Sequence, residues 1–405
     1  MNSVVLFQGQ GKYKTKYAKS LIEKNQELKS IWEQASQILN MNLQELLYKT
    51  EDAGELQTDK AQPLIFMMEY TAWHIFKDTM YEAPMYLAGH SLGEYMALVA
   101  SESVSFEDAV KLVGARGRIM QQEGSVIEQG MLALQGCSYQ HADKLCMKAE
   151  KATGCKIYCA NYNSFDQIIV AGNMVAISYL VDHSDVFTRK LAVSRAFHTP
   201  FMRESAEQYK EVLQTVNFLM PKIPVISNVT GYPYQAAWTI PDLLYRQIFL
   251  PVRWNDIMMY LKQKGVTVYL QVNPNNLFRN MSFGYNEYAQ WGWLEEVSLK
   301  KIKDYDKAYR NKENRQIYLN EFCGDIMKRM LAFPWQKVSE EKMQQAMVEY
   351  RQVEEIVKKA EISIEDVKLC VNKLQNLLSL KGYSVEVIER ESVSVCEKYG
   401  IFDIK

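Results

Sequence analysis

The sequence predicts an α/β protein with a small inserted subdomain and a helical C-terminal extension. Three observations support this fold class: a strand-turn-helix pattern at residues 87–100, LAGHSLGEYMALVA; an alternation of strand-like and helix-like runs between 127 and 195; and amphipathic helical patterns beyond about residue 315. The chain has 405 residues, of which 48% are hydrophobic and 12% aromatic. This length is enough for two or three domains, and this composition is enough to bury a large core.

The first elements are predicted to be a buried strand and several helices. Residues 3–7, SVVLF, form a β-branched and aromatic run that stops at two glycines, which is typical of a strand entering a loop. Helical periodicity covers residues 14–48. The further elements predicted in this part of the chain are a strand at 83–91 and helices at 94–100 and 105–122, the last with Ser105 as its N-cap.

The second strand runs into a nucleophile-elbow pattern, G-x-S-x-G, formed by Gly89-His90-Ser91-Leu92-Gly93. In such an elbow the chain turns sharply from strand to helix and holds the serine hydroxyl exposed at the apex. Glycines are needed because a Cβ at their positions would clash in so tight a turn. A chance glycine-serine turn is the alternative, since short patterns of this kind recur often. The rest of the chain has to decide between them.

Residues 127–195 predict a small inserted subdomain. Three strand-like runs are interspersed here with two helical segments in a βαββαβ-like order. The runs are 130–136, 156–163 and 167–173, and the helices are 139–153 and 174–184. The chain then returns to the main core, where strands are predicted at 222–231 and 266–274 with a helix at 240–248 between them.

The C-terminal part predicts a charged connector followed by helices. Residues 299–315 carry seven basic and three acidic residues and few apolar ones, which indicates a solvated connector. Amphipathic helices are predicted at about 340–360 and from 364 to 378, the second with a Ser363–Asp366 capping box at its start and Gly382 after its end. Because neither helix holds a catalytic constellation, we expect an appendage that packs and does no chemistry.

Composition argues against several classes of function. The net charge of −1 gives no overall bias toward nucleic acid. The seven cysteines are an odd number and lack zinc-site spacing with the five histidines, which argues against a disulfide framework and against a bound metal. No signal-peptide pattern and no stretch of 18 apolar residues is present, so we expect a cytoplasmic protein without a membrane span.

A serine nucleophile needs a general base, and His198 is the best candidate. It lies in SRAFHTPFM, after a strand-like run at 190–194, where a loop begins. His74 falls in a helical pattern typical of a packed core residue, and His90 adjoins the serine and is expected to line the pocket. No Asp or Glu after His198 lies in a distinctive motif. A carbonyl oxygen could orient the imidazole instead, which would make a Ser-His dyad.

These motifs together resemble the malonyl-CoA:acyl-carrier-protein acyltransferases of fatty-acid and polyketide synthesis. In the family's order, residues 1 to about 285 contain FQGQG, AQP, GHSLGEY, RG, NYNSFDQIIVAG, AFH, SNVTG and QIFLPVRW. The tail resembles, more loosely, the extensions of free-standing (trans-acting) acyltransferases that serve polyketide synthases. The resemblance implies an α/β-hydrolase-like core at 1–126 and 196–285, a ferredoxin-like insert at 127–195, and a connector with a helical extension at 286–405.

The resemblance also implies roles for individual residues. Ser91 matches the nucleophile and His198 its general base, while the backbone N–H groups of Gln10 and Leu92 match the oxyanion hole. Arg116 matches the arginine that pairs with the substrate carboxylate, and Gln247 the residue whose backbone carbonyl orients the histidine. Gln62 and Asn163 match pocket-lining residues, where His90 is also expected from its place beside Ser91. Phe197 matches a residue that favours malonyl over branched acyl groups. Gln8 departs from the pattern, since the family usually has proline there.

The implied reaction is a two-step transfer. Ser91 would take malonyl from malonyl-CoA as an ester, and the phosphopantetheine thiol of an acyl carrier protein would then accept it, with no permanently bound cofactor and no nucleic acid or membrane as partner. One alternative is an acyl hydrolase of the same fold that clears carrier proteins. The other is a non-catalytic docking protein, in which a nucleophile elbow would have no use. Arg116 taken alone could also be an ordinary helix-surface arginine.

Overall fold

The computed structural model describes residues 2–77, 83–122, 127–272, 278, 290–293, 312–334, 336, 338–359, 361–385, 387–389 and 391–392. The chain divides into two compact units. The larger comprises Asn2–Tyr285 and Trp291–Glu295, and the smaller is made chiefly of Glu296–Lys405. The boundaries predicted near 126 and 285 fall next to or within segments outside the described residues.

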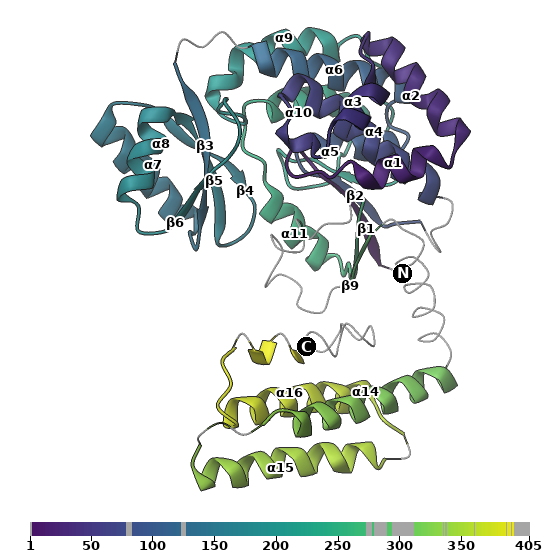
Figure 1. Cartoon of the computed structure of the whole chain (residues 1–405), viewed down its shortest axis with the longest axis vertical. Coiled ribbons are helices and arrows are strands. Elements are labelled where there is room, and N and C mark those ends of the chain that lie inside the picture. Colours follow the sequence, from purple (N-terminus) through teal and green to yellow (C-terminus); the bar gives the residue numbers. More distant parts are fainter. Residues whose placement is uncertain are drawn as a thin grey trace. The chain divides into compact units, whose positions relative to one another are not determined.

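A five-stranded sheet in the order β7-β2-β1-β8-β9 forms the centre of the larger unit (Figure 1). Strand β1 pairs in parallel with β2 and with β8, and β2 pairs in parallel with β7. All five residues of β1 are buried, as expected for a strand with helices on both faces. The strands are β1 Ser3–Phe7, β2 Tyr86–Gly89, β7 Val225–Ile226, β8 Val268–Gln271 and β9 Gln290–Trp293. The sequence therefore predicted the mixed α/β class correctly, although β7 and β8 are shorter than the predicted runs.

Helices cover this sheet, and α4 and α6 pack along each other. Residues 61–69 of α4 are all buried, which is typical of a helix that its neighbours cover on every side. The helices of this part are α1 Lys16–Glu23, α2 Gln26–Leu39, α3 Leu43–Lys49, α4 Thr58–Phe76, α5 Gly93–Ala100, α6 Phe106–Gln122, α9 Arg203–Leu213, α10 Ile240–Gln247 and α11 Trp254–Gln263. The backbone N–H of Asp108 donates to Ser105 Oγ (3.1 Å), which confirms the predicted N-cap of α6.

A separate antiparallel sheet in the order β4-β5-β3-β6 is built from the segment that follows α6. Figure 1 shows α7 and α8 together on one face of this sheet, and their apolar residues share a core with its strands. The elements are β3 Gln129–Gln135, α7 Tyr139–Thr153, β4 Ile157–Tyr162, β5 Gln167–Asn173, α8 Met174–His183 and β6 Phe187–Lys190. The strand predicted at 190–194 is wrong beyond its first residue. The β3–β6 ladder ends at the Leu132–Lys190 pair, after which the chain leaves the sheet edge toward His198.

Within the described residues, the smaller unit contains the helices α14 Lys312–Ala332, α15 Glu340–Val357 and α16 Ile364–Leu380. Their apolar faces share one core, which includes Phe322, Val353 and Leu374. The capping box of Ser363 and Asp366 is present at the start of α16, as predicted. Most of the connector predicted at 299–315 lies outside the described residues. Its last four residues are not connector but the first turn of α14.

Candidate active site

Ser91 lies at the apex of a sharp turn between β2 and α5. Its φ angle is 53°, in the left-handed region, where a non-glycine residue costs about 1–3 kcal/mol of strain. A Cβ on Gly89 would lie 1.9 Å from the Gly93 carbonyl carbon, and one on Gly93 would lie 2.2 Å from the Phe7 carbonyl oxygen. Larger residues would therefore push α5 away from the strand ends. This geometry is that of a nucleophile elbow rather than a chance turn.

Asn228 clamps the elbow from the loop after β7. Its Oδ1 accepts the backbone N–H of Ser91 (2.6 Å), and its Nδ2 donates to the carbonyl of Gly89 (2.6 Å). A single buried amide thus holds both sides of the strained residue. Asn228 lies in the SNVTG motif, and nothing local to that motif indicates a contact with a turn 137 residues away.

Ser91 and His198 form a hydrogen-bonded pair, with 2.8 Å between Oγ and Nε2. The other ring nitrogen, Nδ1, lies 2.7 Å from the backbone carbonyl oxygen of Gln247. Because a carbonyl can only accept, Nδ1 carries the hydrogen and Nε2 is left to accept from the serine hydroxyl. His198 itself has a φ of 59°. A second strained residue therefore faces the first across the reacting atoms.

The environment keeps His198 neutral. Burial, and then the nearby positive charge of Arg116, lower the pKa of His198 from 6.5 to about 3. Only 4% of its surface is exposed. A neutral imidazole with its lone pair toward Ser91 is the form that can remove a proton from the hydroxyl. The pair can therefore act as a nucleophile and its base without a carboxylate.

Arg116 brings a buried positive charge to the same point, with 2% of its surface exposed. Its guanidinium donates to three neutral oxygens: Gln62 Oε1 (2.6 Å), Ser91 Oγ (3.1 Å) and Gln247 Oε1 (3.1 Å). The cation also lies 5.4 Å from the centre of the Tyr95 ring. Among the residues that the structure describes, no carboxylate forms an ion pair with it and its Nε has no hydrogen-bond partner. The guanidinium is thus held by dipoles alone and is suited to receive an anion beside Ser91.

Gln247 connects this cation to a buried carboxyl group. Its Nε2 donates to Glu94 Oε2 (2.7 Å) and to the backbone carbonyl of Ser91 (3.0 Å). Glu94 also accepts from the Tyr234 hydroxyl and from the backbone N–H of Asn228. Burial raises the pKa of Glu94 from 4.5 to about 7, against the opposing effect of these donors. The sequence analysis missed Glu94, because a glutamate in the first turn of a helix is usually exposed.

The loop after β1 reaches the site through a chain of side-chain hydrogen bonds. Gln10 Oε1 accepts from the Thr58 hydroxyl (2.7 Å), and Thr58 Oγ1 accepts from Gln62 Nε2 (2.8 Å). Since Gln62 also accepts from Arg116, the chain runs from the loop to the guanidinium. A Cβ on Gly9 would lie 2.4 Å from the His90 carbonyl oxygen, so the loop packs directly on the elbow. Thr58 is a further residue that the sequence analysis did not identify.

The remaining predicted site residues lie around this centre. Nε2 of His90 is 3.0 Å from Asn163 Oδ1, which ties the elbow to the second sheet, and burial lowers the pKa of His90 to about 4. Phe197 and Leu92 are buried neighbours of His198 and Ser91 in the chain. His74 was expected to be a packed core residue, and this is wrong: a fifth of its side chain is exposed and its Nε2 lies 3.2 Å from Glu27.

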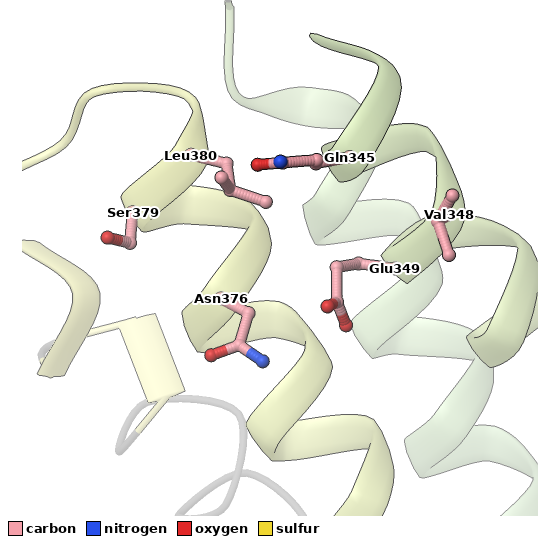
Figure 2. Close-up of a pocket in the computed structure, with 6 residues that line it drawn as sticks. All are labelled: Gln345, Val348, Glu349, Asn376, Ser379 and Leu380. Carbon is pink, nitrogen blue, oxygen red and sulfur yellow. The ribbon is translucent and has the colours of Figure 1, made fainter. Parts of the chain in front are cut away.

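Two pockets differ in their relation to these residues. A cavity of about 380 Å³ lies beside His198, and its walls include Tyr158, Cys159, Tyr162, Phe249 and Pro251. Another pocket, of about 440 Å³, lies in the smaller unit between α15 and α16 (Figure 2). Its lining of Gln345, Val348, Glu349, Asn376, Ser379 and Leu380 includes none of the predicted site residues. The cavity next to His198 has this one predicted site residue in its lining, and Ser91 and Arg116 are not part of that lining.

Two classes of site are not seen in the part of the chain that the structure describes. No group of three or more His, Cys, Asp or Glu side chains gathers there in a way that could hold a metal ion. None of its helices has both the length and the apolar character to cross a bilayer.

Comparisons with known proteins agree with this geometry. The profile of the acyl transferase domain family matches residues 4–290. A malonyl CoA-acyl carrier protein transacylase of Bacillus subtilis is 31% identical over 340 residues, which cover 82% of this chain and 80% of that protein. The crystal structure of FabD from Acinetobacter baumannii superimposes with a TM-score of 0.69 at 28% identity, covering 75% of this chain and 97% of the other. A malonyl-transacylase solved in complex with a type II polyketide-synthase acyl carrier protein has a TM-score of 0.68 at 26% identity, covering 75% of this chain and 99% of the other.

Proposed function

The chain belongs to the acyl transferase family, as do the malonyl CoA-acyl carrier protein transacylases, and from this premise we propose that it transfers malonyl from malonyl-CoA to the phosphopantetheine thiol of an acyl carrier protein. One observation carries the choice of acyl group. The buried guanidinium of Arg116 lies 3.1 Å from Ser91 Oγ, and its hydrogen-bond partners among the described residues are neutral. An acyl group that carries its own carboxylate supplies the missing negative charge.

In the first step His198 removes the proton of Ser91, and Oγ forms a bond to the thioester carbonyl carbon. The carbonyl oxygen becomes negatively charged, and the backbone N–H groups of Gln10 and Leu92 are proposed to stabilise it. The C–S bond then breaks, and the imidazolium returns its proton to the departing sulfur. CoA leaves as a thiol and malonyl stays on Ser91 as an ester. The 2.8 Å contact between Oγ and Nε2 is suited to the first proton transfer.

The second step reverses the first with a different thiol. His198 accepts the proton of the phosphopantetheine thiol, and the sulfur forms a bond to the ester carbonyl carbon. The C–Oγ bond breaks, and the imidazolium gives the proton back to Ser91. Throughout, the Gln247 carbonyl holds the imidazole in the tautomer that keeps Nε2 free, and it stabilises the imidazolium. We propose that the cavity beside His198 admits the thiol-bearing arm.

Arg116 selects the substrate by its charge. The planar guanidinium can form two parallel hydrogen bonds to the malonyl carboxylate. A neutral acyl group would leave this buried cation without an anion, which costs binding free energy. Phe197 is proposed to narrow the space beside the α-carbon. Because one methyl group changes selectivity by only about 1–3 kcal/mol, its preference for malonyl over branched groups is graded rather than absolute.

The smaller unit supports a more specific proposal. It has its own core and lies beyond residue 290, where the match to the acyl transferase profile ends. We propose that the chain is a free-standing, cytoplasmic acyltransferase that serves the carrier proteins of a polyketide synthase. Competition between a polyketide-synthase carrier protein and a fatty-acid carrier protein for the malonyl-enzyme tests this. Equal transfer rates to both would leave the protein a general malonyl transferase.

Intact-mass measurement tests the main proposal. The wild type mixed with malonyl-CoA should gain the mass of one malonyl group, while Ser91→Ala and His198→Ala should gain none in the same time. Adding phosphopantetheinylated carrier protein should move that mass from the enzyme to the carrier. An adduct on Ser91→Ala would place the nucleophile elsewhere, and release of free malonate without carrier loading would make the protein a hydrolase.

A further inference from the structure

We propose that Glu69, a buried residue of α4, is a positioning residue that fixes the loop carrying Gln10 by accepting the backbone N–H of Gln8. The inference rests on the proposed function, because it assigns Glu69 an effect on the acylation of Ser91. It concerns a carboxyl group that touches none of the reacting atoms and that no step of the mechanism uses.

The contact lies between helix and loop. Glu69 is fully buried, and its Oε1 lies 2.5 Å from the backbone nitrogen of Gln8. Gln8 is the first residue after β1 and lies two positions before Gln10. The Gln8 side chain is buried as well, and its Nε2 donates to the backbone carbonyl of Lys12 (3.0 Å). Glu69 thus holds the backbone of Gln8 at the start of the loop, and the side chain of Gln8 holds the backbone of Lys12 at its end.

The loop has little freedom on its other side. The Phe7 carbonyl accepts the backbone N–H of His90 (3.0 Å), and Gly9 lies so close to His90 that a Cβ would be 2.4 Å from its carbonyl oxygen. Rotation of the Gln8 peptide would therefore move Gly9 and Gln10 relative to the elbow. An oxyanion donor acts only when its nitrogen lies within about 2.7–3.1 Å of the developing charge, so a displacement of about 0.5 Å is enough to weaken it.

A buried carboxyl group at this position lowers the stability of the fold if it serves only to fill space. Burial raises the pKa of Glu69 well above its ordinary value. Its second oxygen, Oε2, has no hydrogen-bond partner among the described residues. An apolar side chain of similar length would avoid both penalties. What such a side chain lacks is the acceptor for the N–H of Gln8, so the acceptor is the property that distinguishes glutamate here.

Two variants of Glu69 separate positioning from packing. Glu69→Met fills the same space without a strong acceptor, and Glu69→Gln keeps the acceptor oxygen. Single-turnover acylation by malonyl-CoA should slow about tenfold or more in Glu69→Met, since a fully lost oxyanion donor costs about 10²–10³-fold. Its KM should change less than about threefold, and its melting temperature should equal or exceed that of the wild type. Glu69→Gln should acylate within about threefold of the wild-type rate.

Two further variants serve as controls. Phe66→Leu alters a buried neighbour on α4 whose ring stacks on Phe106, and it should lower the melting temperature while leaving the acylation rate unchanged. Gln8→Pro removes the N–H itself, because proline has none. In that background Glu69→Met should cost little further rate, so the double-mutant cycle reports the coupling of the two groups.

The experiment distinguishes failure of the proposed function from failure of the inference about Glu69. If the wild type takes up no malonyl at Ser91, the proposed function fails. If the wild type acylates and a folded Glu69→Met acylates equally fast, this inference fails alone. Equal losses in Glu69→Met and Glu69→Gln, or full additivity with Gln8→Pro, would also overturn it.

Discussion

Arg116→Ala is the substitution with the clearest expected effect on selectivity. It removes a cation that is 2% exposed and whose hydrogen-bond partners among the described residues are neutral. In the proposed complex this cation binds the substrate carboxylate. A hydrogen bond to a charged group contributes about 1.5–3 kcal/mol, so losing a buried bidentate pair costs roughly 3 kcal/mol or more. At about 1.4 kcal/mol per factor of ten, malonyl transfer should fall by about 10²-fold.

The same substitution also removes donors from the free enzyme. Gln62 Oε1 and Gln247 Oε1 lose their guanidinium partners, and Ser91 Oγ loses a positive neighbour. These losses slow the transfer of every acyl group. Because they are common to all substrates, the ratio of kcat/KM for malonyl-CoA to that for acetyl-CoA isolates the carboxylate contact.

The assay is therefore acylation of Ser91 by the two CoA esters, followed by intact mass in rapid-quench samples. Arg116→Ala should lower the malonyl-to-acetyl ratio by about 10²-fold. Arg116→Lys keeps the charge but not the planar fork, and its ratio should lie between those of the wild type and the alanine variant. Equal losses for malonyl and acetyl in a folded Arg116→Ala would refute the assignment and make the arginine structural.

Two further predictions follow from the buried titratable groups. Because burial and Arg116 lower the pKa of His198 to about 3, the imidazole stays neutral down to about pH 4. In a Glu94→Gln variant, in which no carboxyl with a pKa of about 7 titrates beside the site, kcat/KM should be flat from neutral pH to about pH 4, and an inflection near 6.5 would contradict this. Burial raises the pKa of Glu94 from 4.5 to about 7, so the folded state holds this proton to higher pH, and the free energy of unfolding should fall as pH rises through that window. Glu94→Gln should remove this pH dependence of the free energy of unfolding, which amounts to up to about 3 kcal/mol between pH 4.5 and 8. Urea unfolding measures it, and an unchanged pH dependence in Glu94→Gln would mean that other groups titrate.

The sequence predicted those parts of the fold and the site that depend on local patterns. Residues 3–7 and the elbow around Ser91 are recognisable because apolar runs and glycines act within a few positions. His198 was identified by its place at the start of a loop and Arg116 by resemblance, and the structure brings both within hydrogen-bond distance of Ser91. Their roles stay predictions until acylation is measured.

The sequence could not predict contacts that arise only from tertiary packing. Asn228 holds the elbow across 137 residues, and Glu69 holds the loop at Gln8 across 61 residues. Glutamates on helices are usually exposed, so a helical sequence pattern does not predict that Glu69 and Glu94 are buried. The prediction for His74 was wrong for the same reason: periodicity indicates a helix but does not determine how far a single side chain is buried.

The arrangement of charges explains how Arg116 can remain available to a substrate although a buried carboxyl lies close by. Gln247 stands between the two groups, with its Oε1 toward the guanidinium (3.1 Å) and its Nε2 toward Glu94 (2.7 Å). A direct Glu94–Arg116 pair would neutralise the cation and compete with an incoming carboxylate, since buried pairs of opposite charge attract strongly. The neutral amide satisfies both groups through its dipole instead. Glu94 then holds the elbow through Asn228 and Gln247, and the positive charge beside Ser91 stays available for the acyl carboxylate that we propose it binds.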